Sequence, residues 1–136
     1  MPGPIDKLER EHHALDHLCW QTYQAVSRND QVTAILRFEE FATLSESHFR
    51  AEEELLFERL AKSNAELRGC IDSMKKEHQQ LRRLKQELTL ELAHSMDETT
   101  LQHCERLLRV LRVHAQKEEL LLFNTGRLAW TARDFE

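Results

Sequence analysis

Two stretches of similar sequence, HFRAEEELLF at residues 48–57 and HAQKEELLLF at residues 114–123, decide how this chain folds. In each stretch, apolar residues recur at the steps of three and four that line one face of an α-helix. That apolar stripe is predicted to include Leu55 in the first stretch and Leu121 in the second. A histidine and, four residues later, a glutamate stand within it in both stretches. They are His48 with Glu52, and His114 with Glu118. A helix face that should be buried therefore carries the same two ionisable groups twice.

The similarity extends along the chain at a constant offset of 66 residues. Besides the two stretches, His12 is matched by His78 at the same offset. The other matched pairs are Glu11/Glu77, Leu15/Leu81, Leu18/Leu84, Glu53/Glu119, Leu55/Leu121 and Phe57/Phe123. Because no insertion separates matched positions, we infer a tandem duplication of a helical hairpin. Two such hairpins are expected to pack about an approximate two-fold axis.

The breaks between helices are marked by Ser, Asn and Asp, which cap helix N-termini by accepting a bond from a free backbone N–H. They fall at residues 27–30, 62–66 and 94–98, and both prolines lie within the first four residues. Helices are predicted at 5–27, 31–62, 65–94 and 98–123. Short connections between long amphipathic helices favour antiparallel neighbours. The sequence therefore predicts an all-α protein, an up-down-up-down antiparallel four-helix bundle.

With 136 residues, the chain has the size of one domain with one core. We expect a single domain over residues 1–136, with the bundle at 5–123 and a C-terminal tail at 124–136. The tail is predicted to leave the last helix at Gly126 and to cover one end of the bundle with Leu128 and Trp130. Trp130 and Phe135 could instead serve a dimer contact.

Charge and composition argue against several classes of partner. Lys and Arg are scattered in a chain of net charge −5, so we expect neither a nucleic-acid partner nor a membrane-surface helix. No apolar run approaches the roughly 18 residues that span a bilayer, and the N-terminus lacks the apolar segment of a signal peptide. Three cysteines without C-x-x-C spacing favour reduced, buried thiols and hence a cytoplasmic protein. They are Cys19, Cys70 and Cys104.

Six residues of ligand type are predicted to meet inside the bundle. A charged Glu52 or Glu118 on a buried face costs several kcal/mol unless it is paired or binds a metal, and the buried stripe supplies no Arg or Lys. The histidine four residues earlier points at the same volume, and the two remaining helices each add one imidazole. Four imidazoles and two carboxylates predict a dinuclear metal site. Its ligands are His12, His48, Glu52, His78, His114 and Glu118.

Residues outside this set have weaker patterns. His13, His17, His94 and His103 have no matching histidine in the other half, so we interpret them as surface or supporting groups. Four glutamates next to the predicted ligands are either solvated charges or acceptors for an imidazole N–H. They are Glu11, Glu53, Glu77 and Glu119. A metal-free network of His–Glu hydrogen bonds is the alternative, but it does not readily explain both halves.

The donor set indicates which metal the site would bind. Imidazole and carboxylate without thiolate suit iron or manganese, and two metals sharing six protein ligands fit iron best. Ferritin-like di-iron proteins use Glu-x-x-His at i, i+3 instead. Among the predicted ligands only His12 stands in such a motif, from Glu9 to His12, and Lys75 replaces the glutamate in the second half. The ferritin-like alternative is therefore disfavoured.

These motifs resemble the hemerythrin-like, or HHE cation-binding, family. The resemblance rests on EHHAL at 11–15, EHQQL at 77–81 and the two stretches above, and covers residues 5 to about 123. It implies a four-helix bundle holding two iron ions, bridged by two carboxylates and an oxo or hydroxo group. The implied ligands are the six residues already named.

The chain differs from the oxygen-carrying members at two positions. Where they have an additional histidine on the third helix, this chain has Met74, four residues before His78. Their last carboxylate is an aspartate five residues after the histidine, where this chain has Glu119. We choose Glu118 because it is the mate of Glu52, and Glu119 remains the alternative. A set of four histidines and two glutamates is more similar to the branch that includes iron–sulfur-centre repair proteins.

Losing one imidazole should leave about two open coordination positions instead of one, with Met74 forming an apolar wall. We therefore expect binding of O2 or NO for sensing, storage or scavenging. The alternatives are a di-iron redox enzyme that turns over peroxide or NO or repairs iron clusters, an iron-handling protein, and a metal-free structural bundle. The sequence does not determine whether the protein is an enzyme or whether it has a protein partner.

Overall fold

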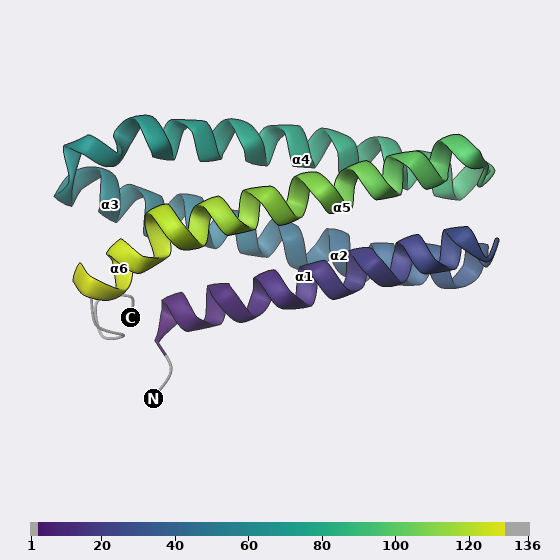
Figure 1. The fold of residues 1–136 in the computed structure, drawn as a ribbon, viewed down its shortest axis with the longest axis horizontal. Helices are drawn as coiled ribbons and strands as arrows, with labels where there is room; N and C mark the ends of the chain where they lie inside the picture. The colour runs from purple at the N-terminus through teal and green to yellow at the C-terminus, as the bar shows by residue number, and fades with distance from the viewer. Residues whose placement is uncertain (1–2, 130–136) are drawn as a thin grey trace.

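The computed structural model describes residues 3–129, and helices make up nearly all of them, with no strand in that range. Four long helical segments follow one another along the chain (Figure 1). The first is α1 (Pro4–Ser27), and the second joins α2 (Gln31–Ala51), the π-helical turn η1 (Glu52–Leu56) and α3 (Phe57–Ser63). The third joins the 3₁₀ turn η2 (Ala65–Leu67) to α4 (Arg68–His94). The fourth joins α5 (Glu98–Glu118), the π-helical turn η3 (Glu119–Phe123) and α6 (Asn124–Ala129).

The three predicted breaks are confirmed, and each carries the expected capping side chain. The carboxylates of Asp30 and Asp97 accept hydrogen bonds from the backbone N–H of the residue three positions later, at 3.2 Å and 3.0 Å. The Asn64 side chain accepts one from the N–H of Glu66 at 3.1 Å. These bonds satisfy N–H groups that a helix N-terminus leaves unpaired.

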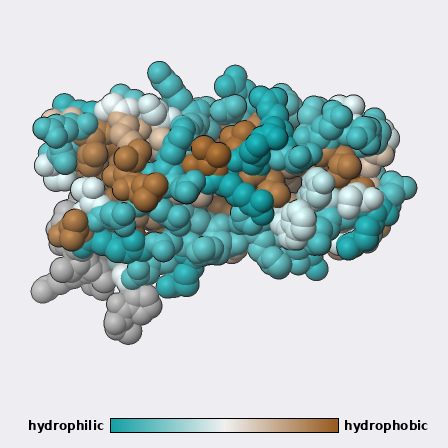
Figure 2. Space-filling view, viewed as in Figure 1, coloured by the Kyte–Doolittle hydropathy of each residue, from teal (hydrophilic) through white to brown (hydrophobic). Residues whose placement is uncertain are grey.

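The all-helical class is confirmed, and the arrangement is consistent with a four-helix bundle. Figure 1 shows the four segments lying lengthwise alongside one another. Helix α1 packs against α2 and α5, and α4 packs against the same two helices. On the face drawn in Figure 2, hydrophilic residues cover most of the surface and hydrophobic residues show as separate patches between them. No helix within residues 3–129 is long and apolar enough to cross a membrane.

The buried core consists of two apolar clusters along the bundle. One contains Ile5 and Leu8 of α1 with Leu56 and Phe57, and the other contains Leu15 and the residues of α1 beyond it. His12 lies between the two clusters along α1, and His78 has the same place between Met74 and Leu81 along α4. A polar layer therefore divides the core.

The helix face that points inward changes at η1 and η3. The sequence predicts Leu55 and Leu121 in the buried stripe, and this prediction is wrong, since the two side chains are 48% and 49% exposed. A π-helical turn holds one more residue than an α-helical turn. The next residues, Leu56 and Leu122, therefore occupy the core positions, and both are fully buried.

The last helix continues past the predicted boundary. It runs through Gly126 to Ala129 in α6, so the predicted exit at Gly126 is wrong. A Cβ atom at position 126 would lie 3.1 Å from Cδ1 of Ile5, so glycine allows α6 to pack closely against α1. Leu128 is 91% exposed and does not cover the end of the bundle. Trp130 and Phe135 lie outside the described residues.

Candidate metal centre

The structure brings together all six residues that the sequence singles out. Each of the four long segments contributes one imidazole, from His12 on α1, His48 on α2, His78 on α4 and His114 on α5. Glu52 opens η1, and Glu118 is the last residue of α5. All six are buried, and both glutamates have no exposed surface.

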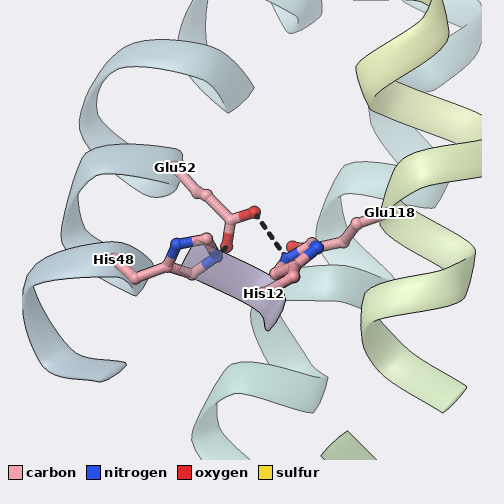
Figure 3. Close-up of side chains that lie close together, drawn as sticks. All are labelled: His12, His48, Glu52 and Glu118. Carbon is pink, nitrogen blue, oxygen red and sulfur yellow. Dashed lines mark hydrogen bonds and ion pairs between the residues drawn. The ribbon is translucent and has the colours of Figure 1, made fainter. Parts of the chain in front are cut away.

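The six side chains form two overlapping groups in which four ligand atoms lie within 4.8 Å of one another. The first group is His12, His48, Glu52 and Glu118, and the second is Glu52, His78, His114 and Glu118. Figure 3 shows the first group, with His48 and Glu52 pointing from one side and Glu118 from the opposite helix. Both glutamates belong to both groups, so each carboxylate stands between two possible ion positions.

Distances between atoms agree with this shared role. Oε1 of Glu118 lies 3.0 Å from Nε2 of His12, while its Oε2 lies 3.1 Å from Nε2 of His114. Oε1 of Glu52 lies 3.3 Å from Nε2 of His48 in the first group and 3.2 Å from Nε2 of His78 in the second, and its Oε2 faces His12 at 3.8 Å. Each carboxylate therefore reaches imidazoles of both groups, as a bridging ligand would.

Several of these buried atoms lack a partner within the described residues. Both oxygens of Glu52, Nε2 of His48 and Nε2 of His114 have no well-directed hydrogen bond. Buried polar groups without a partner are costly. A cation bound between imidazole nitrogens and carboxylate oxygens would satisfy all of them, and this donor set suits iron or manganese. The residues therefore fit a bound metal.

Four further glutamates each face the outer nitrogen, Nδ1, of one imidazole. Nδ1 of His48 donates to Glu11 at 2.9 Å, and Nδ1 of His114 donates to Glu77 at 2.8 Å. In the other pair, His78 donates to Glu53 at 2.6 Å and His12 to Glu119 at 3.3 Å. A carboxylate only accepts, so the proton must be on Nδ1, and the Nε2 lone pair is free to bind a metal.

These contacts answer a question that the sequence left open. The four glutamates hold imidazoles in place and are not simply solvated charges. The hydrogen bonds obey the duplication, because the bonds of Glu11 and Glu53 recur with Glu77 and Glu119 at the offset of 66. Glu118 belongs to both ligand groups and Glu119 to neither.

The comparison with protein families agrees with this geometry. A family model described as the hemerythrin HHE cation-binding domain matches residues 3–125. The chain belongs to this family. Neither the curated proteins nor the solved structures give a match. Membership confirms the resemblance seen in the sequence, and together with the two buried His/Glu groups it supports iron binding by this hemerythrin-like chain.

The two inner glutamates of this hemerythrin-like chain ionise differently without metal. Burial raises the pKa of Glu52 well above its ordinary value, and the nearby charge of Glu118 raises it further. Burial also opposes the charge on Glu118, but its contacts with three imidazoles, with His114 the strongest, hold its pKa well below the ordinary value. Of the two neighbouring carboxyl groups, Glu118 is therefore the stronger acid.

His78 also holds a proton that a metal would displace. Burial lowers the pKa of His78, but its close contacts with the carboxyl groups of Glu118 and Glu52 raise it more strongly, to about 9. Metal binding to this hemerythrin-like centre must therefore release protons, because its ligands bind in their deprotonated forms.

Aromatic rings around the centre are the feature that the sequence reasoning missed. The ring of Phe49 stacks on His78 at 4.2 Å between centroids, and Phe57 lies on the same imidazole at 5.6 Å. Phe123 stacks on His12 at 5.0 Å. The matched pair Phe57/Phe123 could have indicated these rings. The π-helical turns change which helix face points inward, so a regular α-helical period does not predict the direction of either side chain. Met74 is buried in the apolar cluster on one side of the centre, as its predicted role requires.

The histidines without a match lie outside the two ligand groups. His103 bonds to Glu91 at 2.5 Å, far along α5 from the centre. His13 follows His12 on α1 and lines a surface depression with it. Their placement agrees with a surface or supporting role.

Proposed function

We propose that this hemerythrin-like protein binds two iron ions through the six buried residues and takes up O2 or NO there for sensing, storage or scavenging. The observation that carries the proposal is the pair of overlapping groups that share Glu52 and Glu118. A di-iron centre supplies the redox chemistry that lets a small diatomic molecule bind reversibly.

The chain's own residues prepare this site. Glu11, Glu53, Glu77 and Glu119 fix the imidazole tautomers and make the Nε2 atoms better ligands. Two iron ions offer about twelve positions if each is octahedral, and four imidazole nitrogens and four carboxylate oxygens fill eight of them. The remaining positions are available to solvent and to an added ligand. Buried Leu8, Met74 and Phe123 exclude bulk water from this region.

The proposal has further parts that concern the whole chain. The connections at residues 28–30, 64 and 95–97 are short, which supports an up-down-up-down course of the four segments. We further propose that residues 1–136 form one domain. The three free cysteines support a cytoplasmic location, and the net charge of −5 supports the proposal that neither nucleic acid nor a membrane surface is a partner.

Metal analysis of protein expressed with iron tests the proposal first. We expect two irons per chain, and substantial loss of iron in His48→Ala and, separately, in His114→Ala. His17→Ala is the matched control, because this histidine is outside both ligand groups. Stopped-flow absorbance of the reduced protein mixed with O2 or NO should then show a distinct adduct spectrum. Iron-free wild-type protein, or featureless oxidation with O2 and no change with NO, would contradict the proposal.

A redox enzyme that turns over peroxide or NO is the second candidate. Met74 stands where another imidazole would fill a coordination position, so the centre has room for a reacting molecule. Peroxide consumption separates the candidates, since a binding protein should consume no more than about one equivalent per site. Continued turnover would favour the enzyme.

A further inference from the structure

The two halves of the molecule supply matching ligands but cover them differently. His12 and His78 are mates at the offset of 66, and each bonds to the corresponding outer glutamate. His78 has no exposed surface, whereas His12 is 7% exposed. The neighbours of the two imidazoles explain this difference.

His78 is enclosed between two aromatic rings, Phe49 at 4.2 Å and Phe57 at 5.6 Å, both within about 20° of parallel. Arg82 closes the outer side, because its guanidinium lies 5.4 Å from the ring centroid of Phe49. The same guanidinium donates to both oxygens of Glu53 at 3.1 Å, and also to Glu46. These contacts hold the arginine in place over the α2–α4 face.

Within the described residues, His12 is stacked against one phenylalanine only. Phe123 takes the place of Phe57, but the mate of Phe49 is Ala115, so no second phenyl ring covers this imidazole. A depression of about 230 Å³ opens there on the α1–α5 face. It is lined by His12, His13, Asp16, Arg112, Ala115, Gln116 and Glu119.

The charged side chains over the two imidazoles also differ between the halves. The mate of Arg82 is Asp16, and the mate of Glu46 is Arg112, so the ion pair recurs with its charges reversed. Arg112 donates to Asp16 at 2.7 Å, and both side chains are well exposed. A carboxylate at position 16 repels Glu119, so it cannot anchor there as Arg82 anchors on Glu53. Exposed ion pairs contribute little stability, so this one opens easily.

We propose that small molecules reach the centre through the α1–α5 face, past Ala115 and the Asp16–Arg112 pair, while Phe49 and Arg82 seal the α2–α4 face. The molecules concerned are diatomic gases and small linear anions, and to that extent the inference rests on the proposed function. Position 115 then sets the rate and size limit of exchange without contributing a ligand.

Azide binding to the iron-loaded protein measures exchange through this face. Ala115→Phe should slow azide association and dissociation together by about tenfold, which corresponds to about 1.4 kcal/mol of added barrier. The equilibrium constant should stay within about twofold, because a closed route changes no ligand of the iron. Asp16→Ala should raise both rates. Val113→Phe is the size control, since residue 113 is half exposed on the same helix and does not line the depression. Unchanged rates in Ala115→Phe would overturn the inference.

A second measurement needs no metal and separates this inference from the proposed function. Diethyl pyrocarbonate acylates accessible imidazoles, and peptide mass spectrometry reports the rate at each histidine. In the metal-free protein, Ala115→Phe should slow the reaction of His12, while Val113→Phe should leave it unchanged. An unchanged rate at His12 in Ala115→Phe would overturn the inference even if iron binds. Failure to bind iron with this effect of Ala115→Phe intact would overturn only the proposed function.

Discussion

The inner glutamates, Glu52 and Glu118, and their immediate neighbours, Glu53 and Glu119, have the same chemistry and opposite environments. The inner pair is fully buried between imidazole Nε2 atoms, while Glu53 and Glu119 are partly exposed and accept from Nδ1. The inner pair carries unpaired oxygens at Glu52, whereas Glu53 is neutralised by Arg82. Full burial between imidazole Nε2 atoms is therefore what distinguishes the proposed metal ligands from the groups that orient the imidazoles.

Removing one member of an adjacent pair should break this comparison most strongly. In Glu118→Ala we expect loss of at least one iron per chain, because both ligand groups contain this carboxylate. Glu119→Ala should keep both irons under the same loading conditions. Metal analysis by mass spectrometry reads the difference. Iron lost from Glu119→Ala but kept in Glu118→Ala would reverse the assignment of the two roles.

The π-helical turn η1 also predicts a difference in stability between two neighbouring leucine variants. Leu56→Ala should lower the free energy of unfolding by about 2–5 kcal/mol, since a fully buried leucine leaves a cavity. Leu55→Ala should change it by no more than about 0.5 kcal/mol, because this side chain is half exposed. Urea titrations of the metal-free variants measure both. Equal effects at 55 and 56 would mean that the helix keeps its α-helical register there.

An outer glutamate should matter less than an inner one. Glu77→Gln keeps the shape but weakens the acceptor for Nδ1 of His114, so iron affinity should fall by about 10–100-fold. Competition with a chelator gives the affinity. Glu87→Gln is the control, since this exposed glutamate lies ten residues further along the same helix and belongs to neither ligand group. An unchanged affinity in Glu77→Gln would remove the orienting role.

The smallest expected effect is a dependence on pH that reverses with metal. In the metal-free protein, the pKa of His78 is raised to about 9. Its contribution to stability is fully present below its unfolded pKa of about 6.5 and is lost as the pH rises through 9. We expect the free energy of unfolding to fall over that range, whereas iron affinity should rise with pH as the ligands deprotonate. The metal-free His78→Gln variant should not show this fall in stability between pH 6.5 and 9.

The sequence alone predicted the helices and the six side chains that meet inside the bundle, because a duplication doubles each signal. The caps at Asp30 and Asp97 fixed the breaks, and the repeat separated the four matched histidines from the other four. The prediction from helical periodicity failed where the backbone departs from the α-helical period, so it placed Leu55 and Leu121 in the core. The end of the last helix was missed because glycine usually stops a helix, whereas Gly126 allows contact with Ile5.

The sequence identified the four outer glutamates as possible acceptors for imidazole N–H groups, but it could not decide whether they have this role. A helical period gives the direction of Glu11 or Glu53 from its own axis, but not which imidazole of a neighbouring helix it meets. For the same reason, the sequence could not predict that phenylalanine rings stack on His12 and His78. Phe49 differs from Ala115 in an otherwise matched position, and only the packing of α1 against α5 shows that the difference exposes His12.

Crystals of iron-loaded protein, with anomalous scattering measured on both sides of the iron absorption edge, test the central claim most directly. We expect two iron peaks inside the bundle, one beside His12 and His48 and one beside His78 and His114, with Glu52 and Glu118 spanning both. A single iron peak, or two peaks with either glutamate turned away from them, would contradict a shared dinuclear centre.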